Sequence, residues 1–211
     1  MRTVRRVSSP SDDAQARIDH FKETAQRSTS SPSRLSMYEI DTRDEVHTLE
    51  GVPQSSVGAP LPFIVSDEHR VVLGYHLEAT DPEWDGRTAR IVGPTDASEP
   101  FAIVRFAPCY AHMLGPPNDE AFAGHPLASR GLRPYGAYEV RHSSWIRRLE
   151  RMNSVHEHHR PEAFRDRRHL ILSFHDTTFE CVCGAFDVRI GHGAIAEAVP
   201  AMVKLLDWHP R

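Results

Sequence analysis

The segment RHLILSFHDTTFECVCGAFDVRIG, residues 168–191, constrains the fold of this chain more than any other. Two alternating apolar runs flank Asp176 and Thr177, which predicts a β-hairpin with a two-residue turn at that pair. Gly184 interrupts the alternation of the second run, as a β-bulge would. The expected cross-strand pairs are His175 with Thr178, Phe174 with Phe179, Leu172 with Cys181, and Leu170 with Cys183.

The two faces of this hairpin differ in chemistry. Residues two apart on a strand share a face, so Cys181 and Cys183 point to the side of Leu172 and Phe174. This position predicts buried thiols that pack as small hydrophobic groups. The opposite face is expected to carry Ile171, Ser173, His175, Thr178, Glu180 and Val182.

Other strands are predicted at residues 70–79, 87–94, 100–108 and 136–142, where apolar residues alternate between turn signals. Residues 143–153 predict a helix, because Ser143 or Ser144 can accept a hydrogen bond from the first turn and the apolar residues share one face.

The chain is expected to end in a second helix, whose apolar stripe is Ile195, Val199, Met202 and Leu206. Pro200 either kinks this helix or begins its second part. Together these elements predict an α+β protein with a mainly antiparallel sheet, curved or forming a partial barrel, and two or three flanking helices.

The first 36 residues are poor in core-forming side chains. Serine and proline segments flank a weak helical pattern, in which Ala14, Ile18, Phe21 and Ala25 follow a candidate N-cap at Ser11. Residues 1–36 therefore predict a mobile arm with one helix, which either docks on the domain or binds a partner. Residues 37–211 are expected to form a single globular domain.

Composition excludes several classes of protein. The formal net charge is −4 and the arginines alternate with acids, which argues against a nucleic-acid partner and favours a solvated arginine surface. No apolar run is long enough to span a membrane, and no secretory signal is recognisable. Three cysteines do not make a disulfide framework, so a soluble cytoplasmic protein is expected.

The sequence VHEHHR, residues 155–160, is the densest histidine cluster. A zincin motif requires His, Glu, two residues and then His, but Arg160 occupies the last position. Pro161 also disfavours a helical Arg160. The segment is therefore interpreted as a solvated connection between the helix and the hairpin.

The segment YAHMLGPPNDEAFAGHPL, residues 110–127, is the strongest candidate for a functional site. Two glycines and three prolines break it into rigid turns, and binding residues often lie on such loops. Its histidines can serve as acid–base groups or metal ligands, with a nearby acid to orient an imidazole. The alternative is a short helix over residues 119–124, capped by Asn118 or Asp119 and ended by Gly124. The candidate catalytic residues are His112, His125, Asp119 and Glu120.

A second candidate group lies on strands. His175 shares a hairpin face with Ser173 and Glu180, and His76 with Glu78 forms a similar pair on another strand. Asn118, His175, Glu180 and His76 are therefore candidate ligand-binding residues. Glycine-rich dinucleotide and phosphate loops are absent from the sequence, as is a G-x-S-x-G nucleophile motif.

Three segments, HMLGPPNDEAFAGHPL, YEVRHSSWIRRLERMNSVH and HLILSFHDTTFECVC, resemble an uncharacterised bacterial protein family over roughly residues 60–206. The resemblance implies no activity, cofactor or catalytic residue.

Two functions are consistent with these features. The first is an accessory or binding domain that recognises a small molecule or protein through residues 110–127 and the polar hairpin face. The alternative is a small enzyme that uses His112, His125 and an acid from residues 118–120. The cofactor is not specified by the sequence, and a divalent metal is the candidate that the histidines suggest.

Overall fold

The fold is seen in a computed structural model, which describes residues 38–79, 91–97 and 99–207. These residues belong to one compact unit, Met37–Arg211. The expected N-terminal arm and residues 87–90 lie outside the described residues. The described half of the strand expected at residues 87–94 is irregular, so that part of the prediction is wrong.

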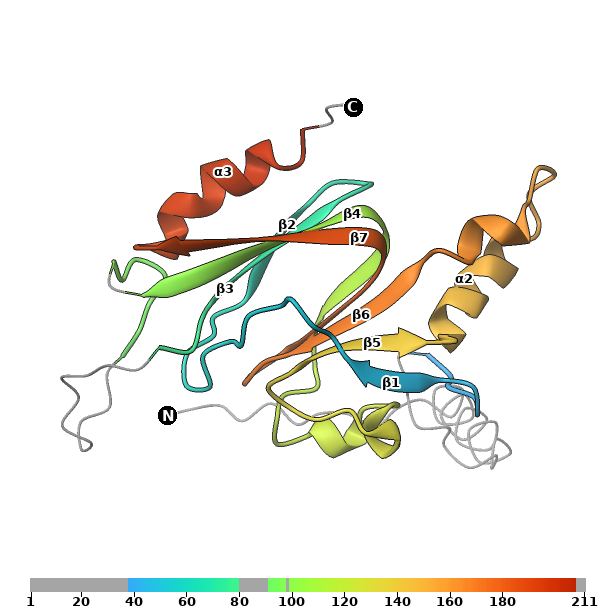
Figure 1. The fold of residues 1–211 in the computed structure, drawn as a ribbon, viewed down its shortest axis with the longest axis horizontal. Helices are drawn as coiled ribbons and strands as arrows, with labels where there is room; N and C mark the ends of the chain where they lie inside the picture. Colours follow the sequence, from blue (N-terminus) through green and yellow to red (C-terminus); the bar gives the residue numbers. More distant parts are fainter. Residues whose placement is uncertain (1–37, 80–90, 98, 208–211) are drawn as a thin grey trace, which may run out of the picture. The chain divides into compact units, whose positions relative to one another are not determined.

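Seven antiparallel strands form one open sheet (Figure 1). Their spatial order is β1-β5-β6-β7-β4-β3-β2, so β1 and β2 are the two edges. Helices and short turns accompany the sheet, which makes the protein α+β and mainly antiparallel. The strands are β1 (Glu45–Thr48), β2 (Phe63–Ser66), β3 (Val71–His76), β4 (Pro100–Gly115), β5 (Ala137–Arg141), β6 (Arg168–Ser173) and β7 (Thr178–His192).

The long strands β4 and β7 pair along almost their whole length and bend together (Figure 1). The pairing register shifts between Cys109 and Ala111, so the bulge lies on β4 and not at Gly184, where the sequence predicted it. Gly184 serves a different purpose. A Cβ atom there would lie 2.9 Å from Cδ of Pro108, so glycine permits the close approach of β4 and β7.

Strand β4 runs well beyond the end expected at Pro108. Proline is excluded from the interior of a sheet because it cannot donate to the ladder. The pairing of β3 with β4 ends at Val71 and Phe106, however, so Pro108 lies past the end of β3. The first third of the 110–127 segment is therefore strand and not loop.

The predicted β6–β7 hairpin is present, with a different turn. Ser173 pairs with Thr178 and Leu172 with Phe179, so the turn is centred on His175 and Asp176. The expected register was off by two residues. Because side chains alternate with a period of two, this slip leaves every residue on its predicted face.

The two α-helices are α2 (Ser144–Asn153) and α3 (Val199–Lys204). Ser143 caps α2 as predicted, since its hydroxyl oxygen accepts a hydrogen bond from Ile146 N at 3.2 Å. Pro200 lies in the first turn of α3 and so begins a new helix after a 3₁₀ turn. The short 3₁₀ turns are η1 (Phe122–Gly124), η2 (Ala128–Arg130), η3 (Pro161–Phe164) and η4 (Ile195–Ala198).

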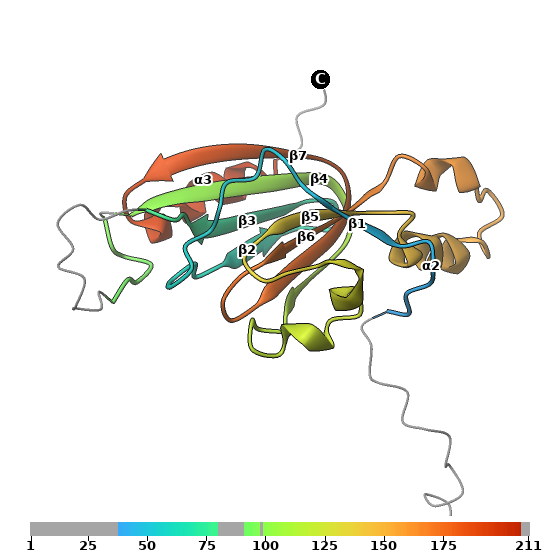
Figure 2. The ribbon, with the colours of Figure 1, turned by 60° about the horizontal axis from the view of Figure 1, so that its bottom comes forward.

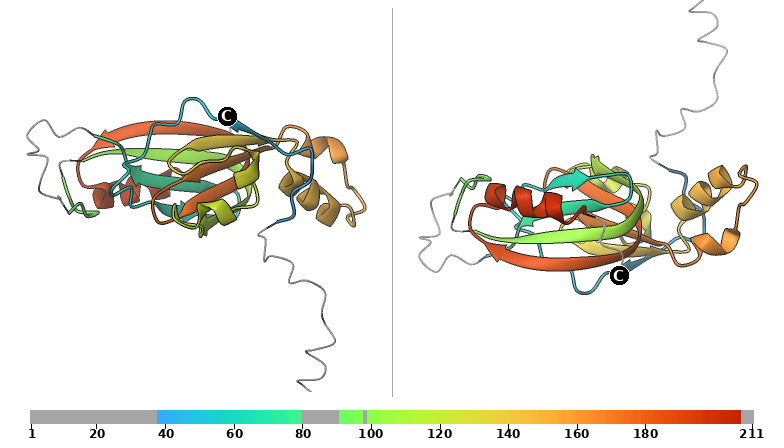
Figure 3. Two further views of the ribbon diagram at one scale, coloured as in Figure 1. Left: turned by 90° about the horizontal axis from the view of Figure 1, so that it is seen from below. Right: turned by 90° about the horizontal axis from the view of Figure 1, so that it is seen from above.

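Three groups of apolar side chains fill the two faces of the sheet. The largest lies inside the bend and includes Leu73, Phe106 and Phe179, with all three cysteines. On the other face, η4 and α3 cover β2 and β3 (Figure 3, right). The third group joins Ile171 and Val140 to the 116–133 segment, which packs beside β5 and β6 (Figure 2).

The VHEHHR segment lies in the turns that connect α2 to η3, as expected. Arg160 is extended, with φ −129° and ψ 107°, which agrees with the effect of the following proline. His159 is the one histidine of this segment that packs closely, with Nε2 at 2.7 Å from Glu150 Oε1.

Candidate functional site

A buried carboxylate, Glu180 on β7, lies at the centre of a polar cluster. Its Oε1 is 2.9 Å from His125 Nε2, and its Oε2 is 2.9 Å from His169 Nε2. The Tyr38 hydroxyl donates to Oε2, also at 2.9 Å. The sequence predicted two members of this cluster, His125 and Glu180, and the fold brings them together.

The second nitrogen of each histidine is also engaged. Leu127 N donates to His125 Nδ1 at 3.1 Å, so His125 carries its proton on Nε2 and is neutral in this arrangement. His169 Nδ1 is 2.9 Å from the Ser143 hydroxyl, the same oxygen that caps α2. The cluster therefore ties the sheet to the 116–133 segment and to the start of α2.

The electrostatics of the cluster favour an ionised Glu180. Burial alone would raise the pKa of Glu180, but hydrogen bonds from His125 and His169 outweigh it and hold the pKa at about 2. Burial and the neighbouring Glu180 raise the pKa of Tyr38, which keeps its hydroxyl a donor. The side chains of His125, His169 and Glu180 are 0% exposed. The cluster is a satisfied polar core, and a ligand cannot reach it unless the fold opens.

A second group of three side chains is open to solvent at the tip of the β6–β7 hairpin. The Tyr135 hydroxyl donates to Asp119 Oδ2 and lies 2.9 Å from His175 Nδ1. His175 Nδ1 is also 3.1 Å from Asp119 Oδ2. The side chain of His175 is 43% exposed and that of Asp119 is 19% exposed. We call Asp119, Tyr135 and His175 the hairpin-tip site.

The backbone fixes this site from both sides. Asp119 N donates to His175 O at 2.9 Å, and the Thr178 hydroxyl donates to Pro117 O at the same distance. The turn after Pro117 is closed by Asn118, whose side-chain oxygen accepts from Ala121 N at 3.0 Å. Asn118 therefore stabilises the turn that presents Asp119, whereas the short helix η1 begins only at Phe122 and has no side-chain cap.

In the hairpin-tip site, Tyr135 is the hydrogen-bond donor and Asp119 is the charged acceptor. The hydrogen bond from Tyr135 is the main cause that lowers the pKa of Asp119, and the same bond raises the pKa of Tyr135 to about 12. Because Nδ1 of His175 faces Asp119, the other ring nitrogen, Nε2, faces away from the pair. A ring whose Nδ1–H donates to Asp119 presents Nε2 as an oriented acceptor.

The remaining predicted residues do not join either group. His112 pairs with Cys181 across the strands and so lies on the face opposite to Glu180 and His125. Its Nδ1 is 3.9 Å from Cys109 Sγ, and burial lowers its pKa. His76 is 0% exposed on β3, where its ring nitrogens have no hydrogen-bond partner among the described residues. Glu120 is exposed beside Asp119.

Four residues were not predicted as members of these sites: Tyr38, Tyr135, His169, and Ser143, which was expected only as a helix cap. The signal for His169 was present in the sequence. It lies two residues before Ile171 in the hairpin, so strict alternation places it on the face of Glu180. Tyr38 and Tyr135 stand in irregular segments without periodicity, and no local pattern indicates their partners.

Among the described residues, no group of three or more histidine, cysteine, aspartate or glutamate side chains is arranged to hold a metal ion. No helix in that part of the chain is both long and apolar enough to cross a membrane. No family model, curated protein or solved structure matches this chain.

Proposed function

We propose that this protein is a binding domain that recognises a hydrogen-bond donor of positive charge through the hairpin-tip site. The observation that carries the proposal is the convergence of Asp119, Tyr135 and His175, from three separate segments, on one half-exposed position. The cationic group would belong to a small molecule or to a side chain of a partner protein.

The charges around the site support this choice of ligand. Asp119 is ionised over the physiological range, since its pKa is lowered. Asp176 in the hairpin turn is exposed and close enough to Tyr135 to contribute to its raised pKa, and Glu120 is exposed next to Asp119. An ammonium or guanidinium group would meet these acids and the outward nitrogen of His175, with charge-assisted hydrogen bonds.

The buried Glu180 cluster supports the same conclusion indirectly. It holds the 116–133 segment against the sheet through His125, and this segment carries Asp119. A rigid support keeps a binding residue in place and lowers the entropic cost of binding. We further propose a cytoplasmic location, which is supported by the three buried cysteines that form no disulfide.

The binding proposal is tested by NMR titration of the isotope-labelled protein with methylguanidinium, and with acetate as the probe of opposite charge. We expect saturable shifts of amide signals at residues 119, 135 and 175 with methylguanidinium and not with acetate. Asp119→Asn, which removes the charge and keeps the shape, should weaken binding about tenfold or more. Glu157→Gln, in an exposed turn, is the matched control and should leave binding unchanged. Shifts that are spread evenly over all surface acids would contradict the proposal.

A second candidate function is general-base catalysis by His175. The specific observation is that a carboxylate holds Nδ1 of the ring and leaves Nε2 outward, which is how a catalytic imidazole is oriented. Hydrolysis of p-nitrophenyl acetate measures this activity. We expect His175→Ala to remove turnover above that of free imidazole, whereas His158→Ala, at an exposed position, should not. Equal rates in both variants would eliminate this candidate.

A further inference from the structure

A groove at the other end of β5 and β6 gathers arginine side chains. It encloses about 630 Å³ between the end of β5, the first turns of α2 and the residues that connect η3 to β6. The sequence predicted arginines dispersed among acids on a solvated surface. The fold instead places six guanidinium groups around one hollow: Arg43, Arg141, Arg147, Arg165, Arg167 and Arg168.

Four of these arginines are paired with carboxylates, among them Arg165, whose guanidinium lies 3.6 Å from Glu162 Oε1. Arg168 makes two hydrogen bonds to Glu139, at 2.9 and 2.8 Å. Arg147 and Arg43 both pair with Asp41, at 2.6 and 2.9 Å. These pairs shape the rim of the groove and leave little net charge at those positions.

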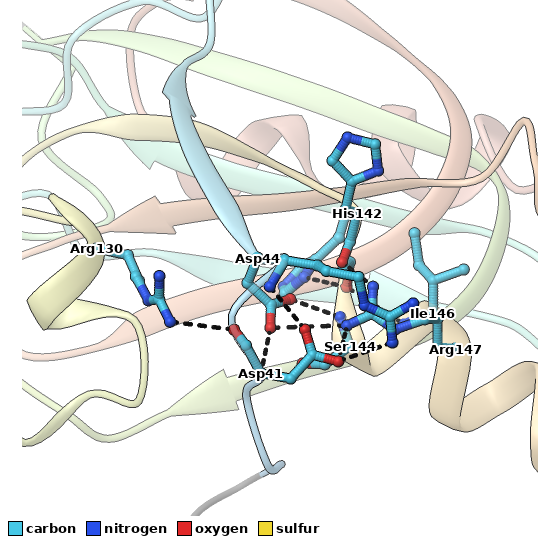
Figure 4. Close-up of polar contacts among 10 residues, drawn as sticks. Asp41, Asp44, Arg130, His142, Ser144, Ile146 and Arg147 are labelled. Atoms are coloured by element: carbon cyan, nitrogen blue, oxygen red, sulfur yellow. Dashed lines mark hydrogen bonds and ion pairs between the residues drawn. The ribbon is translucent and has the colours of Figure 1, made fainter.

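The Asp41 side of the rim is held by the start of α2 (Figure 4). Asp44 is buried, and its carboxylate accepts from Ser144 N at 2.6 Å and from Asp41 N at 2.8 Å. Arg147 also donates to the carbonyl oxygen of His142. The N-terminus of α2 is therefore already occupied by a carboxylate of the chain itself, and it is not the feature that would attract a ligand.

Arg167 differs from the neutralised arginines. Its guanidinium carbon lies 3.5 Å from the ring centre of Phe164 and 3.8 Å from that of Tyr110. Its Nε donates to Ala163 O at 3.2 Å, and its side chain is also hydrogen-bonded to that of Tyr110, so its polar partners in the fold are neutral groups. No carboxylate lies within ion-pair distance of Arg167 among the described residues, and burial is the main cause that lowers its pKa.

Arg141 is the second available cation. It is exposed, and no ion pair to it is formed within the described part of the chain. It lies near enough to Glu139 to help Arg168 lower the pKa of that carboxyl. The groove therefore contains two cations without a bonded counter-ion, and one of them is partly withdrawn from water. Arg167 has only neutral partners, so a bound anion would add the charge-assisted hydrogen bonds that a carboxylate makes to the other arginines.

We propose that this groove binds a small phosphate monoester, with the phosphate group at Arg167 and Arg141. A phosphate monoester carries close to two negative charges at neutral pH and offers three acceptor oxygens, which matches two guanidinium groups. A carboxylate supplies only one charge. The groove walls also include Val140, Ile146 and Phe164, so an apolar body attached to the phosphate would have a complementary surface. The volume lies in the range of small-molecule sites.

This site is independent of the hairpin-tip site. Strand β5 begins two residues after Tyr135 and ends at Arg141, whereas β6 begins at Arg168 and ends two residues before His175. The two sites thus lie at opposite ends of the same strand pair. Failure of one proposal leaves the other standing.

Isothermal titration calorimetry with phenyl phosphate tests the proposal, with benzoate and inorganic phosphate at the same ionic strength for comparison. We expect saturable binding of phenyl phosphate, weaker binding of inorganic phosphate and weaker binding still of benzoate. Arg167→Gln should lower the affinity for phenyl phosphate about tenfold or more, and Arg141→Gln should lower it several-fold. Arg167→Lys should restore only part of the affinity, because it keeps the charge and loses the planar fork.

The matched control is Arg189→Gln, at an exposed position on β7 outside the groove. It should leave the affinity for phenyl phosphate unchanged, and the melting temperature of every variant shows whether it is folded. The proposal is overturned if phenyl phosphate does not saturate, if benzoate binds as tightly, or if Arg189→Gln weakens binding as much as Arg167→Gln. Tighter binding of a single-stranded oligonucleotide that displaces phenyl phosphate would also overturn it, in favour of a nucleic-acid ligand.

Discussion

At the scale of single residues, the fold depends on a few positions where chemistry or size leaves no alternative. Gly184 permits the approach of Pro108, and Glu180 provides the acceptor for two histidines and a tyrosine. The sequence marked both positions, since Gly184 broke an alternating pattern and Glu180 lay on a polar strand face. It misassigned their roles, because each role depends on a partner far away in the chain.

Gly184→Ala is expected to destabilise the protein by about 1–3 kcal/mol. The new Cβ would lie 2.9 Å from Cδ and 3.3 Å from Cγ of the Pro108 ring, which cannot rotate away. Urea unfolding at neutral pH measures the change. Gly115→Ala is the control, because a Cβ there meets nothing within 4 Å. A similar cost for both variants would mean that the contact with Pro108 is not the cause.

At the scale of elements, local patterns indicated the central strands and the helices with errors at their ends, but they missed the edge strands β1 and β2 and placed a strand at residues 87–94 whose described half is irregular. The hairpin turn was displaced by one residue and β4 by several, because turn position and strand length depend on the neighbouring strands. Helix α2 was predicted with its cap, since an N-cap is a contact between residues three apart. The second bond of Ser143, to His169, lies outside any local pattern.

Ser143→Ala is expected to cost about 1–2 kcal/mol of unfolding free energy, because it removes the cap of α2 and the partner of His169. Ser144→Ala is the matched control. The Ser144 hydroxyl is buried and has no hydrogen-bond partner among the described residues, so its loss should change stability by less than about 0.5 kcal/mol. Thermal unfolding of the two variants measures both changes in stability. Equal losses of stability would refute the assignment of Ser143 as the cap of α2.

At the scale of the whole molecule, the bend of β4 and β7 and the covering of the sheet decide which side chains meet. Tyr38, His125 and His169 reach Glu180 from different parts of the chain, and the six arginines of the groove are spread from Arg43, just before β1, to Arg168 at the start of β6. A sequence pattern does not specify these long-range contacts, because each of the side chains, taken alone, is of a type that is common on protein surfaces.

The Glu180 cluster predicts a dependence of global stability on pH. The pKa of Glu180 falls from 4.5 to about 2 on folding, so its contribution is complete above pH 4.5 and is lost as the pH falls toward 2. The full contribution is about 3 kcal/mol. Glu180→Gln should lower stability at pH 7 and reduce the loss between pH 5 and pH 2. Urea unfolding of both proteins across this range measures the difference, and parallel curves would show that Glu180 does not titrate as described.

The sequence by itself determined the class of fold, the hairpin, the cap of α2 and the face on which each hairpin residue lies. These follow from contacts between near neighbours, for which a period of two or of 3.6 residues is sufficient. Only the tertiary structure decided that His125 is sealed against Glu180 while His175 is open beside Asp119, and that dispersed arginines share one groove. The reason is physical: burial and charge pairing depend on the order and bend of the strands, which bring distant residues within a few ångströms.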